Sequence, residues 1–138
     1  MTNPNIQQIS FRTFSILSIL LIATSFSWAQ SDKTPKKLLK SSVAVKGHIG
    51  GEAHDSFVIW ANNRRRMTVE ISWRRKDNNK ANFVVSYSSN FFDGEQVDFG
   101  GESYEGDRWT GIVPKSGKYY IYVTAHPDAK YTLKVTIE

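Results

Sequence analysis

Two stretches, Lys118-Tyr-Tyr-Ile-Tyr-Val-Thr124 and Tyr131-Thr-Leu-Lys-Val-Thr-Ile137, decide the fold class of this chain. In each stretch every second residue is apolar, which is the period of a β-strand and differs from the 3.6-residue period of a helix. The connection between them, residues 125–130, contains Pro127, which cannot donate a hydrogen bond to a strand ladder. We therefore expect two strands joined as a hairpin at the C-terminal end.

The same strand-like character continues upstream of these two segments. Shorter β-rich runs are separated by turn-forming clusters such as Gly50-Gly51 and Asp93-Gly94. No stretch shows the periodicity of an amphipathic helix. Seven or eight short strands at nearly regular spacing predict an all-β domain, either an antiparallel sandwich or a barrel. The upstream runs are residues 43–49, 56–61, 67–73, 82–87 and 109–113.

The first 29 residues have the pattern of a secretory signal peptide. Arg12 is their only charged side chain, an apolar run extends from Phe14 to Phe26, and Ser27-Trp-Ala29 places small residues at positions −3 and −1 of a cleavage site. The apolar run is shorter than the roughly 20 residues that cross a bilayer. We therefore expect cleavage after Ala29, export to the periplasm or extracellular space, and no membrane span in the mature chain.

Composition excludes several classes of protein. The chain has 138 residues and no cysteine, which rules out disulfides, thiolate metal sites and a cysteine nucleophile. Removal of residues 1–29 leaves 109 residues with 17 basic and 13 acidic side chains, a formal charge of +4.

Residues 30–41 are polar and basic, and we expect a flexible leader with a possible helical turn near 36–40. Residues 42–138 form the expected domain, which is held together by its hydrophobic core alone.

No enzyme signature is present, and we expect neither catalysis nor a cofactor. The chain lacks the serine-hydrolase elbow, the zinc-protease helix motif and the glycine-rich phosphate loop. The pair His54-Asp55 has the residue types for acid–base chemistry. Adjacent strand residues point to opposite faces, however, so we interpret His54 as a turn or surface histidine.

The charges are segregated along the sequence. Residues 64–80 hold seven basic side chains, in one cluster at each end of the expected strand 67–73. Residues 93–107 hold six acidic side chains and no basic one. The basic set can bind an anionic polymer, and the acidic set can supply oxygen ligands to calcium. The alternative for both is solvated loops that protect sheet edges. Because the chain is expected to be exported, we expect no nucleic-acid partner.

The mature chain resembles bacterial pre-peptidase C-terminal domains, which are β-sandwiches of the jelly-roll kind. The resemblance rests on Val45-Lys-Gly-His-Ile49, Asp55-Ser-Phe-Val-Ile59, Arg66-Met-Thr-Val-Glu-Ile71 and the segment 109–123 with 131–135. Within that fold, the order of a signal peptide, the first strand 41–47, the loop 100–108 and Trp109-Thr-Gly-Ile-Val-Pro-Lys-Ser-Gly-Lys-Tyr119 is similar to the periplasmic inhibitors of goose-type (g-type) lysozyme.

That resemblance implies a non-enzymatic protein that blocks the cleft of a g-type lysozyme with a loop. The segment Gly100-Gly-Glu-Ser-Tyr-Glu-Gly-Asp-Arg-Trp109 combines glycines with an aromatic side chain and a guanidinium, residue types that dominate many interfaces. We expect Ser103, Tyr104 and Arg108 to form the inhibitory loop and Trp109 to lie in the core. Secondary candidates are Tyr120 and Tyr122, which would form an aromatic strip if their face is solvated, and His126 and Lys130 in the last connection.

Two other functions remain open at the level of sequence. The basic clusters and the tyrosine face suit a module that binds peptidoglycan or another cell-wall or extracellular polysaccharide. A structural domain that binds a protein partner is also compatible with the pattern. Fold resemblance alone does not decide among these functions.

Overall fold

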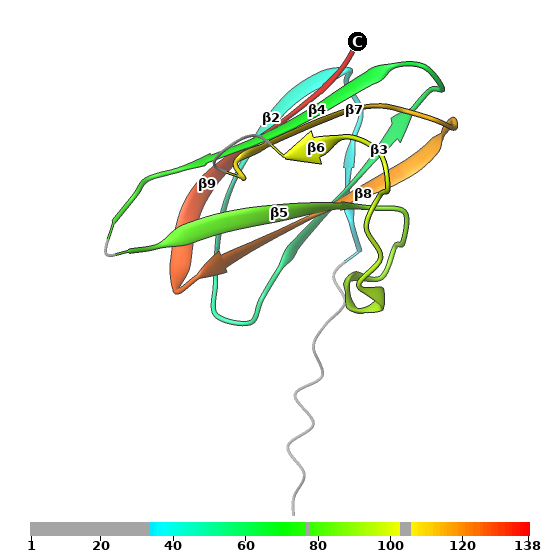
Figure 1. The fold of residues 1–138 in the computed structure, drawn as a ribbon. Helices are drawn as coiled ribbons and strands as arrows, with labels where there is room; N and C mark the ends of the chain where they lie inside the picture. Colours follow the sequence, from blue (N-terminus) through cyan, green and yellow to red (C-terminus); the bar gives the residue numbers. More distant parts are fainter. Residues whose placement is uncertain (1–33, 77, 103–105) are drawn as a thin grey trace, which may run out of the picture. The chain divides into compact units, whose positions relative to one another are not determined.

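A computed structural model describes residues 34–76, 78–102 and 106–138 of the chain. The expected signal peptide, residues 1–29, lies outside the described residues. The described residues form two sheets that pack face to face as a β-sandwich (Figure 1). Within these ranges no helix has the length and apolar character needed to span a bilayer.

The two sheets use strands from distant parts of the sequence. The four-stranded sheet has the order β1-β3-β8-β5, and the five-stranded sheet has the order β2-β9-β4-β7-β6. All neighbouring strands are antiparallel except β1 and β3. The strands are β1 (Lys36–Leu38), β2 (Ser42–Gly50), β3 (Asp55–Ala61), β4 (Arg66–Trp73), β5 (Lys80–Ser86), β6 (Gly101–Glu102), β7 (Arg108–Ile112), β8 (Gly117–His126) and β9 (Asp128–Ile137).

The predicted sandwich is confirmed, and each of the seven expected strand segments coincides with one of the strands that have five residues or more. The core lies between the sheets, where alternate side chains of β8 and of β9 belong to one buried apolar cluster. Ile121 and Val123 on β8, and Leu133 and Val135 on β9, have no measurable exposure. The alternation of apolar residues in the sequence therefore arises because each strand buries one face.

The expected C-terminal hairpin is wrong. β8 pairs with β3 and β5, whereas β9 pairs with β2 and β4, so the chain crosses from one sheet to the other at His126-Pro127. The reason is that both strands bury their apolar face in the same core from opposite sides. Alternation shows which face of a strand is buried, but it does not show which strand lies beside it.

The expected helical turn in the leader is also wrong. Residues Lys36–Leu38 form β1, which pairs in parallel with Phe57, Val58 and Ile59 of β3. Leu38 is buried, with 7% of its surface exposed, while the next residue, Leu39, is 79% exposed. Burial of one apolar side chain and pairing along an open sheet edge outweigh the local preference of this lysine-rich segment.

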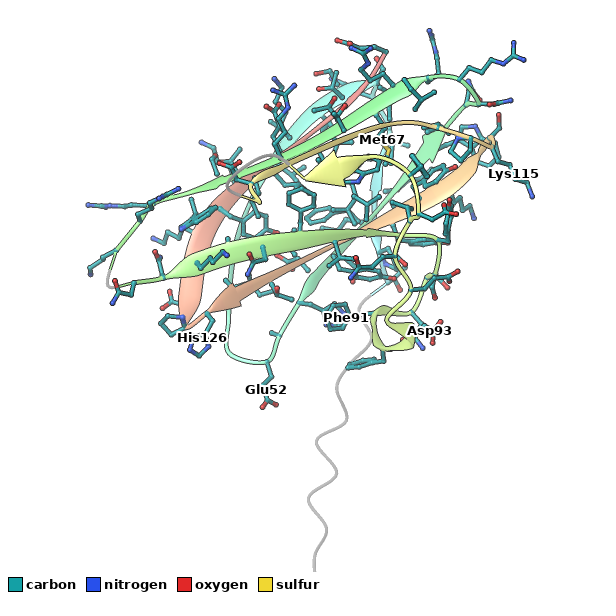
Figure 2. All side chains as sticks on the ribbon, in the orientation of Figure 1. Glu52, Met67, Phe91, Asp93, Lys115 and His126 are labelled. Atoms are coloured by element: carbon teal, nitrogen blue, oxygen red, sulfur yellow. The ribbon has the colours of Figure 1, made fainter. Side chains whose placement is uncertain are left out.

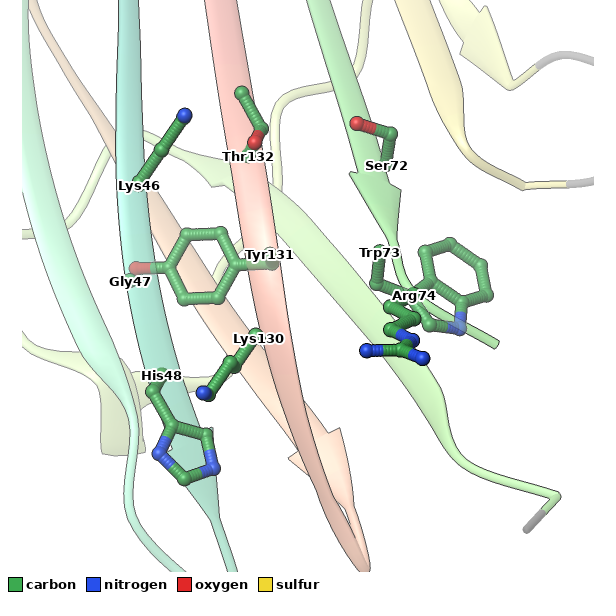
Figure 3. A pocket seen from close by; sticks show the side chains of 9 residues that line it. All are labelled: Lys46, Gly47, His48, Ser72, Trp73, Arg74, Lys130, Tyr131 and Thr132. Carbon is green, nitrogen blue, oxygen red and sulfur yellow. The ribbon is translucent and has the colours of Figure 1, made fainter. Parts of the chain in front are cut away.

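A tyrosine ties the two sheets together near one end of the sandwich. Tyr131 on β9 donates a hydrogen bond from its hydroxyl to Asp55 Oδ2 at the start of β3, with an O···O distance of 2.5 Å. Burial, together with the neighbouring carboxylate of Asp55, raises the pKa of Tyr131 well above its usual value. The ring lies over Gly47 of β2, where a Cβ atom would overlap it (Figure 3).

Gly47→Ala is expected to destabilise the fold by about 2 kcal/mol, because the added methyl group displaces the Tyr131 ring from a close-packed position. Urea unfolding followed by tryptophan fluorescence measures this change. Gly117→Ala is the matched control, since a Cβ atom at this strand position has no neighbour within 4 Å. Equal stability of the two variants would contradict the role assigned to Gly47.

The pair Leu38 and Leu39 tests whether β1 belongs to the folded domain. Leu38→Ala is expected to lower the free energy of unfolding by about 2 kcal/mol, because it leaves a cavity at a buried position. Leu39→Ala is expected to change it by less than about 0.5 kcal/mol, as is typical of an exposed site. If both variants match the unsubstituted protein in urea unfolding, β1 contributes nothing to stability.

Candidate functional site

The edge of the five-stranded sheet carries a hairpin made of β6 and β7. Gly101 pairs with Thr110 and Glu102 with Trp109, so β6 and β7 are paired on both sides of the connection 103–107. Trp109 is 7% exposed, which confirms the expectation that it lies in the core. The amide of Ile71 on β4 donates to the carbonyl of Asp107 with an N···O distance of 2.8 Å. Both ends of the connection are therefore fixed to the sheet.

Gly100 makes the entry into this hairpin possible. Its φ of +84° lies in the left-handed region, which is costly for residues with a side chain. A Cβ atom at this position would also lie 2.5 Å from the carbonyl oxygen of Thr110 and 2.7 Å from Cζ2 of Trp109. The glycine thus allows the backbone to pass directly against the Trp109 ring.

Of the three residues expected in the inhibitory loop, Ser103 and Tyr104 lie outside the described residues, and Arg108 begins β7. The Arg108 side chain is 55% exposed, and its Nε lies 3.8 Å from Oε1 of Glu70 on β4. Lys134 on β9 approaches the other oxygen of Glu70, with an Nζ···Oε2 distance of 3.7 Å. One carboxylate is therefore shared by two cations on the outer face of this sheet.

The shared carboxylate restrains Arg108 only weakly. Exposed ion pairs at such distances contribute about 0–1 kcal/mol, because water screens them and both side chains lose freedom. The three side chains line a hollow of about 460 Å³ on the outer face. A carboxylate from another molecule can therefore replace Glu70 as the partner of Arg108 at small cost, and the resulting charge-assisted hydrogen bond would be stronger if the site is desolvated.

The condition for a tyrosine strip on the outer face of β8, that this face is solvated, is not met at Tyr122. Tyr120 is partly exposed, but Tyr122 is 3% exposed and donates its hydroxyl to the carbonyl of Ser88 at 2.8 Å. The 3₁₀ turn η1 (Phe91–Asp93) covers this part of the sheet (Figure 2), and the Phe91 ring lies 5.3 Å from the Tyr122 ring. A strip cannot form because the connection after β5 folds back over it.

The connection after β5, which carries Phe91, also buries His54. Its ring stacks on Phe91 with a centroid distance of 4.4 Å and lies 5.9 Å from Tyr122, so His54 is buried rather than at the surface as expected. Asp55 instead accepts the hydrogen bond from Tyr131. The two residues therefore face different surroundings, and the structure does not bring them together for acid–base chemistry.

The two candidates in the last connection are separated by the chain crossing. His126 ends β8 in the four-stranded sheet, and Lys130 lies on β9 in the five-stranded sheet; both are exposed (Figure 2). Lys130 pairs in register with His48 of β2 and lines a hollow with Arg74. It therefore lies on the same sheet face as Arg108, whereas the structure does not connect His126 with that face.

Sequence reasoning missed three basic residues on this face: Lys46, His48 and Lys134. They lie on β2 and β9, far in sequence from the basic segment 64–80, and strand pairing brings them beside it. The sequence does contain a sign of their exposure: the period of two places Lys46 and His48 on the face of β2 that is opposite to the buried side chain of Ile49. The sequence alone does not show that β2 pairs with β9, so it could not predict that these residues share one surface with the segment 64–80.

Two acidic side chains of the segment 93–107, Asp93 and Asp98, have separate partners. Asp93 accepts hydrogen bonds from Ser88 and Asn90 at 2.5 and 2.8 Å, and Asp98 accepts one from Tyr87 at 2.7 Å. Burial and the hydrogen bond to Asp98 raise the pKa of Tyr87 to about 12. Among the described residues, no group of three acidic or histidine side chains is arranged to hold a metal ion.

Comparison with known proteins identifies the class of fold. The chain matches no family model and no curated protein. Among solved structures, the pre-peptidase C-terminal domain of a Bacillus anthracis collagenase is 18% identical, with a TM-score of 0.50, over 75% of this chain and 94% of that chain. This similarity and the two antiparallel-dominated sheets confirm the fold that the resemblance implied.

More similar structures are periplasmic inhibitors of g-type lysozyme. The inhibitor from Aeromonas hydrophila is 25% identical, with a TM-score of 0.61, and the match covers 76% of this chain and 96% of the inhibitor. The inhibitor from Salmonella Typhimurium is 19% identical, with a TM-score of 0.54, over 76% of this chain and 99% of the inhibitor. The resemblance to this class of inhibitors is thus confirmed by structure.

Gly100→Ala is expected to loosen the β6–β7 hairpin, because it combines a strained φ with a clash against Trp109. Limited digestion with trypsin, followed by mass spectrometry, should show cleavage after Arg108 at least fivefold faster than in the unsubstituted protein. Gly94→Ala is the control, since Gly94 has a φ of +63° but no atom within 4 Å of an added Cβ. Equal cleavage rates after Arg108 in both variants would show that Gly100 does not hold the hairpin.

Proposed function

We propose that this chain is an exported, non-enzymatic inhibitor of g-type lysozyme that blocks the active-site cleft with the loop around residues 101–108. The observation that supports the proposal most strongly is the structural similarity to the Aeromonas hydrophila inhibitor over 96% of that protein. The apolar N-terminal segment of the sequence and the periplasmic location of the similar inhibitors both support export.

The chemistry of a glycosidase cleft explains how such a loop would act. A cleft of this kind presents a catalytic carboxyl group beside subsites that bind sugar rings. Arg108 would form a charge-assisted pair with that carboxyl group, and Tyr104 would take the place of a sugar ring. The weak pair between Arg108 and Glu70 lets the guanidinium change partner on binding, with little loss of stability.

Anchoring of the loop favours tight binding. The hydrogen bond from Ile71 to Asp107 and the pairing of β6 with β7 fix the residues that flank 103–105 to the sheet before a partner is met. Binding residues that a sheet already holds, such as Arg108, lose less conformational entropy when they bind. The proposal therefore assigns the inhibitory contact to the hairpin edge of the five-stranded sheet.

A turbidity assay of cell-wall lysis tests this function. A micromolar excess of the purified mature chain is expected to slow lysis by a g-type lysozyme, while lysozymes of other types serve as specificity controls. Arg108→Ala is expected to raise the inhibition constant at least tenfold, since a central interface arginine often contributes more than about 1.4 kcal/mol.

Arg65→Ala is the matched control for that substitution. Arg65 is an exposed arginine directly before β4, five residues before Glu70, the β4 residue that pairs with Arg108. Its removal changes the net charge equally and should leave the inhibition constant within twofold of the original. Failure of the unsubstituted chain to slow lysis would refute inhibition, and an unchanged constant for Arg108→Ala would refute the assigned loop.

A further inference from the structure

The outer face of the five-stranded sheet carries a concentration of positive charge that extends from Arg108, the residue assigned to inhibition, across β4 and β9 to β2. Strand pairing aligns Lys46 of β2 with Thr132 of β9 and Ser72 of β4. The next row toward one end has His48 beside Lys130, and the row on the other side has Lys134 beside Glu70 and Arg108. Four strands thus contribute to one charged surface.

This surface is hollowed rather than flat. Lys46, His48, Arg74 and Lys130 surround a hollow of about 530 Å³ (Figure 3). Ser72 and Thr132 line both this hollow and the one beside Arg108 and Lys134. His48, Arg74 and Lys130 also line a third hollow, which extends to Lys76 and Asn79. The three hollows share walls and form a continuous depression, which we call the basic groove.

Charge in the basic groove is strongly unbalanced. Its lining includes six lysine and arginine side chains and three carboxylates, a formal charge of +3 with His48 neutral. Two of the carboxylates already have partners, since Asp128 Oδ2 lies 2.9 Å from His48 Nε2 and Glu70 lies between Arg108 and Lys134. The six basic residues are Lys46, Arg74, Lys76, Arg108, Lys130 and Lys134.

The spacing of these charges suits an extended ligand. Lys130 and Lys134 lie four residues apart on one strand and are separated by about 13 Å, while Lys46 lies between their rows on the neighbouring strand. A small anion would contact one or two of these side chains. An extended polymer with repeated negative charges can contact several of them at once and release its counterions.

We propose that the basic groove binds an anionic polysaccharide whose carboxylate or sulfate groups pair with the lysine and arginine side chains. The hydroxyls of Ser72 and Thr132 lie between the charged rows, where they can exchange hydrogen bonds with sugar hydroxyls. Among the large apolar side chains of the groove lining, Ile71 and Tyr131 are buried, and Trp73 is partly buried with its indole N–H donated to the carbonyl of Asn79 at 3.2 Å. This arrangement disfavours insertion into a lipid bilayer.

The ligand class is testable with defined polymers. Heparin and polygalacturonate fragments of uniform length carry sulfate and carboxylate groups, and dextran of similar length is the neutral control. Isothermal titration calorimetry of the mature chain at 50 mM sodium chloride is expected to show binding to both anionic polymers and none to dextran. The affinity should fall at least tenfold at 300 mM, because salt screens exposed charges.

Two sets of variants locate the binding surface. Lys46→Gln combined with Arg74→Gln removes two charges from the groove and is expected to weaken heparin binding at least tenfold. The matched control is Lys37→Gln combined with Lys118→Gln, which removes two exposed lysines from the other sheet and should change the affinity by less than twofold. Glu70→Gln is expected to strengthen binding by two- to fivefold, because it removes a carboxylate from the path of the polymer.

Each outcome decides the proposal without reference to lysozyme. No binding to either anionic polysaccharide, or an equal loss in the groove variant and its control, would overturn it. Binding of single-stranded DNA, or of vesicles containing anionic lipid, as tightly as heparin would overturn the assignment to polysaccharide. Circular dichroism of every variant confirms that the fold is retained, and the gain expected for Glu70→Gln cannot arise from partial unfolding.

Discussion

Packing of the four-stranded sheet against the five-stranded sheet is the interaction on which the rest of the structure depends. The inner side chains of β8 and β9, Ile121 and Val123 on one sheet and Leu133 and Val135 on the other, are fully excluded from water. Burial of each such side chain stabilises the fold by about 1.5–3 kcal/mol. Because the chain contains no cysteine, no disulfide supports this contact. Hydrophobic packing between the sheets must therefore hold the domain together.

Both candidate surfaces derive from this core. β9 lies between β2 and β4 in the five-stranded sheet, where it carries Leu133 inward and Lys134 outward. β4 and β7 extend the same sheet to the β6–β7 hairpin, so the loop and the basic groove are built on paired strands. A rigid sheet that positions a loop and a row of charges is a common way to present binding residues. Arg108 belongs to both surfaces, since it lies where the hairpin meets the groove.

The sequence was sufficient to predict the seven strands that have five residues or more. Alternation identified β8 and β9, and the expectation that Trp109 lies in the core was correct, whereas the short strands β1 and β6 were not predicted. Alternation did not reveal that β8 and β9 lie in different sheets, because both bury their apolar faces in one core. Burial of Tyr122 under Phe91 was not predictable for a related reason: it depends on how the connection after β5 folds back.

Neither could the basic groove be predicted from the linear sequence. The charge of residues 64–80 was evident, but Lys46, Lys130 and Lys134 join it only through the pairing of β2, β9 and β4. Conversely, the segment 36–40 was expected to remain outside the fold because it is rich in lysine. Its composition did not indicate that Leu38 is buried. Local composition predicts exposure well, but it does not predict which exposed residues become neighbours.

Hydrogen–deuterium exchange of the chain, alone and in complex with a g-type lysozyme, tests the central claim most directly. The account predicts slower exchange in the complex for amides of residues 100–108 and for the adjoining part of β4. Amides of the four-stranded sheet and of η1 should exchange at the same rate in both states. Protection confined to η1 and the outer face of β3 and β8, with residues 100–108 unchanged, would contradict the assignment of the inhibitory surface.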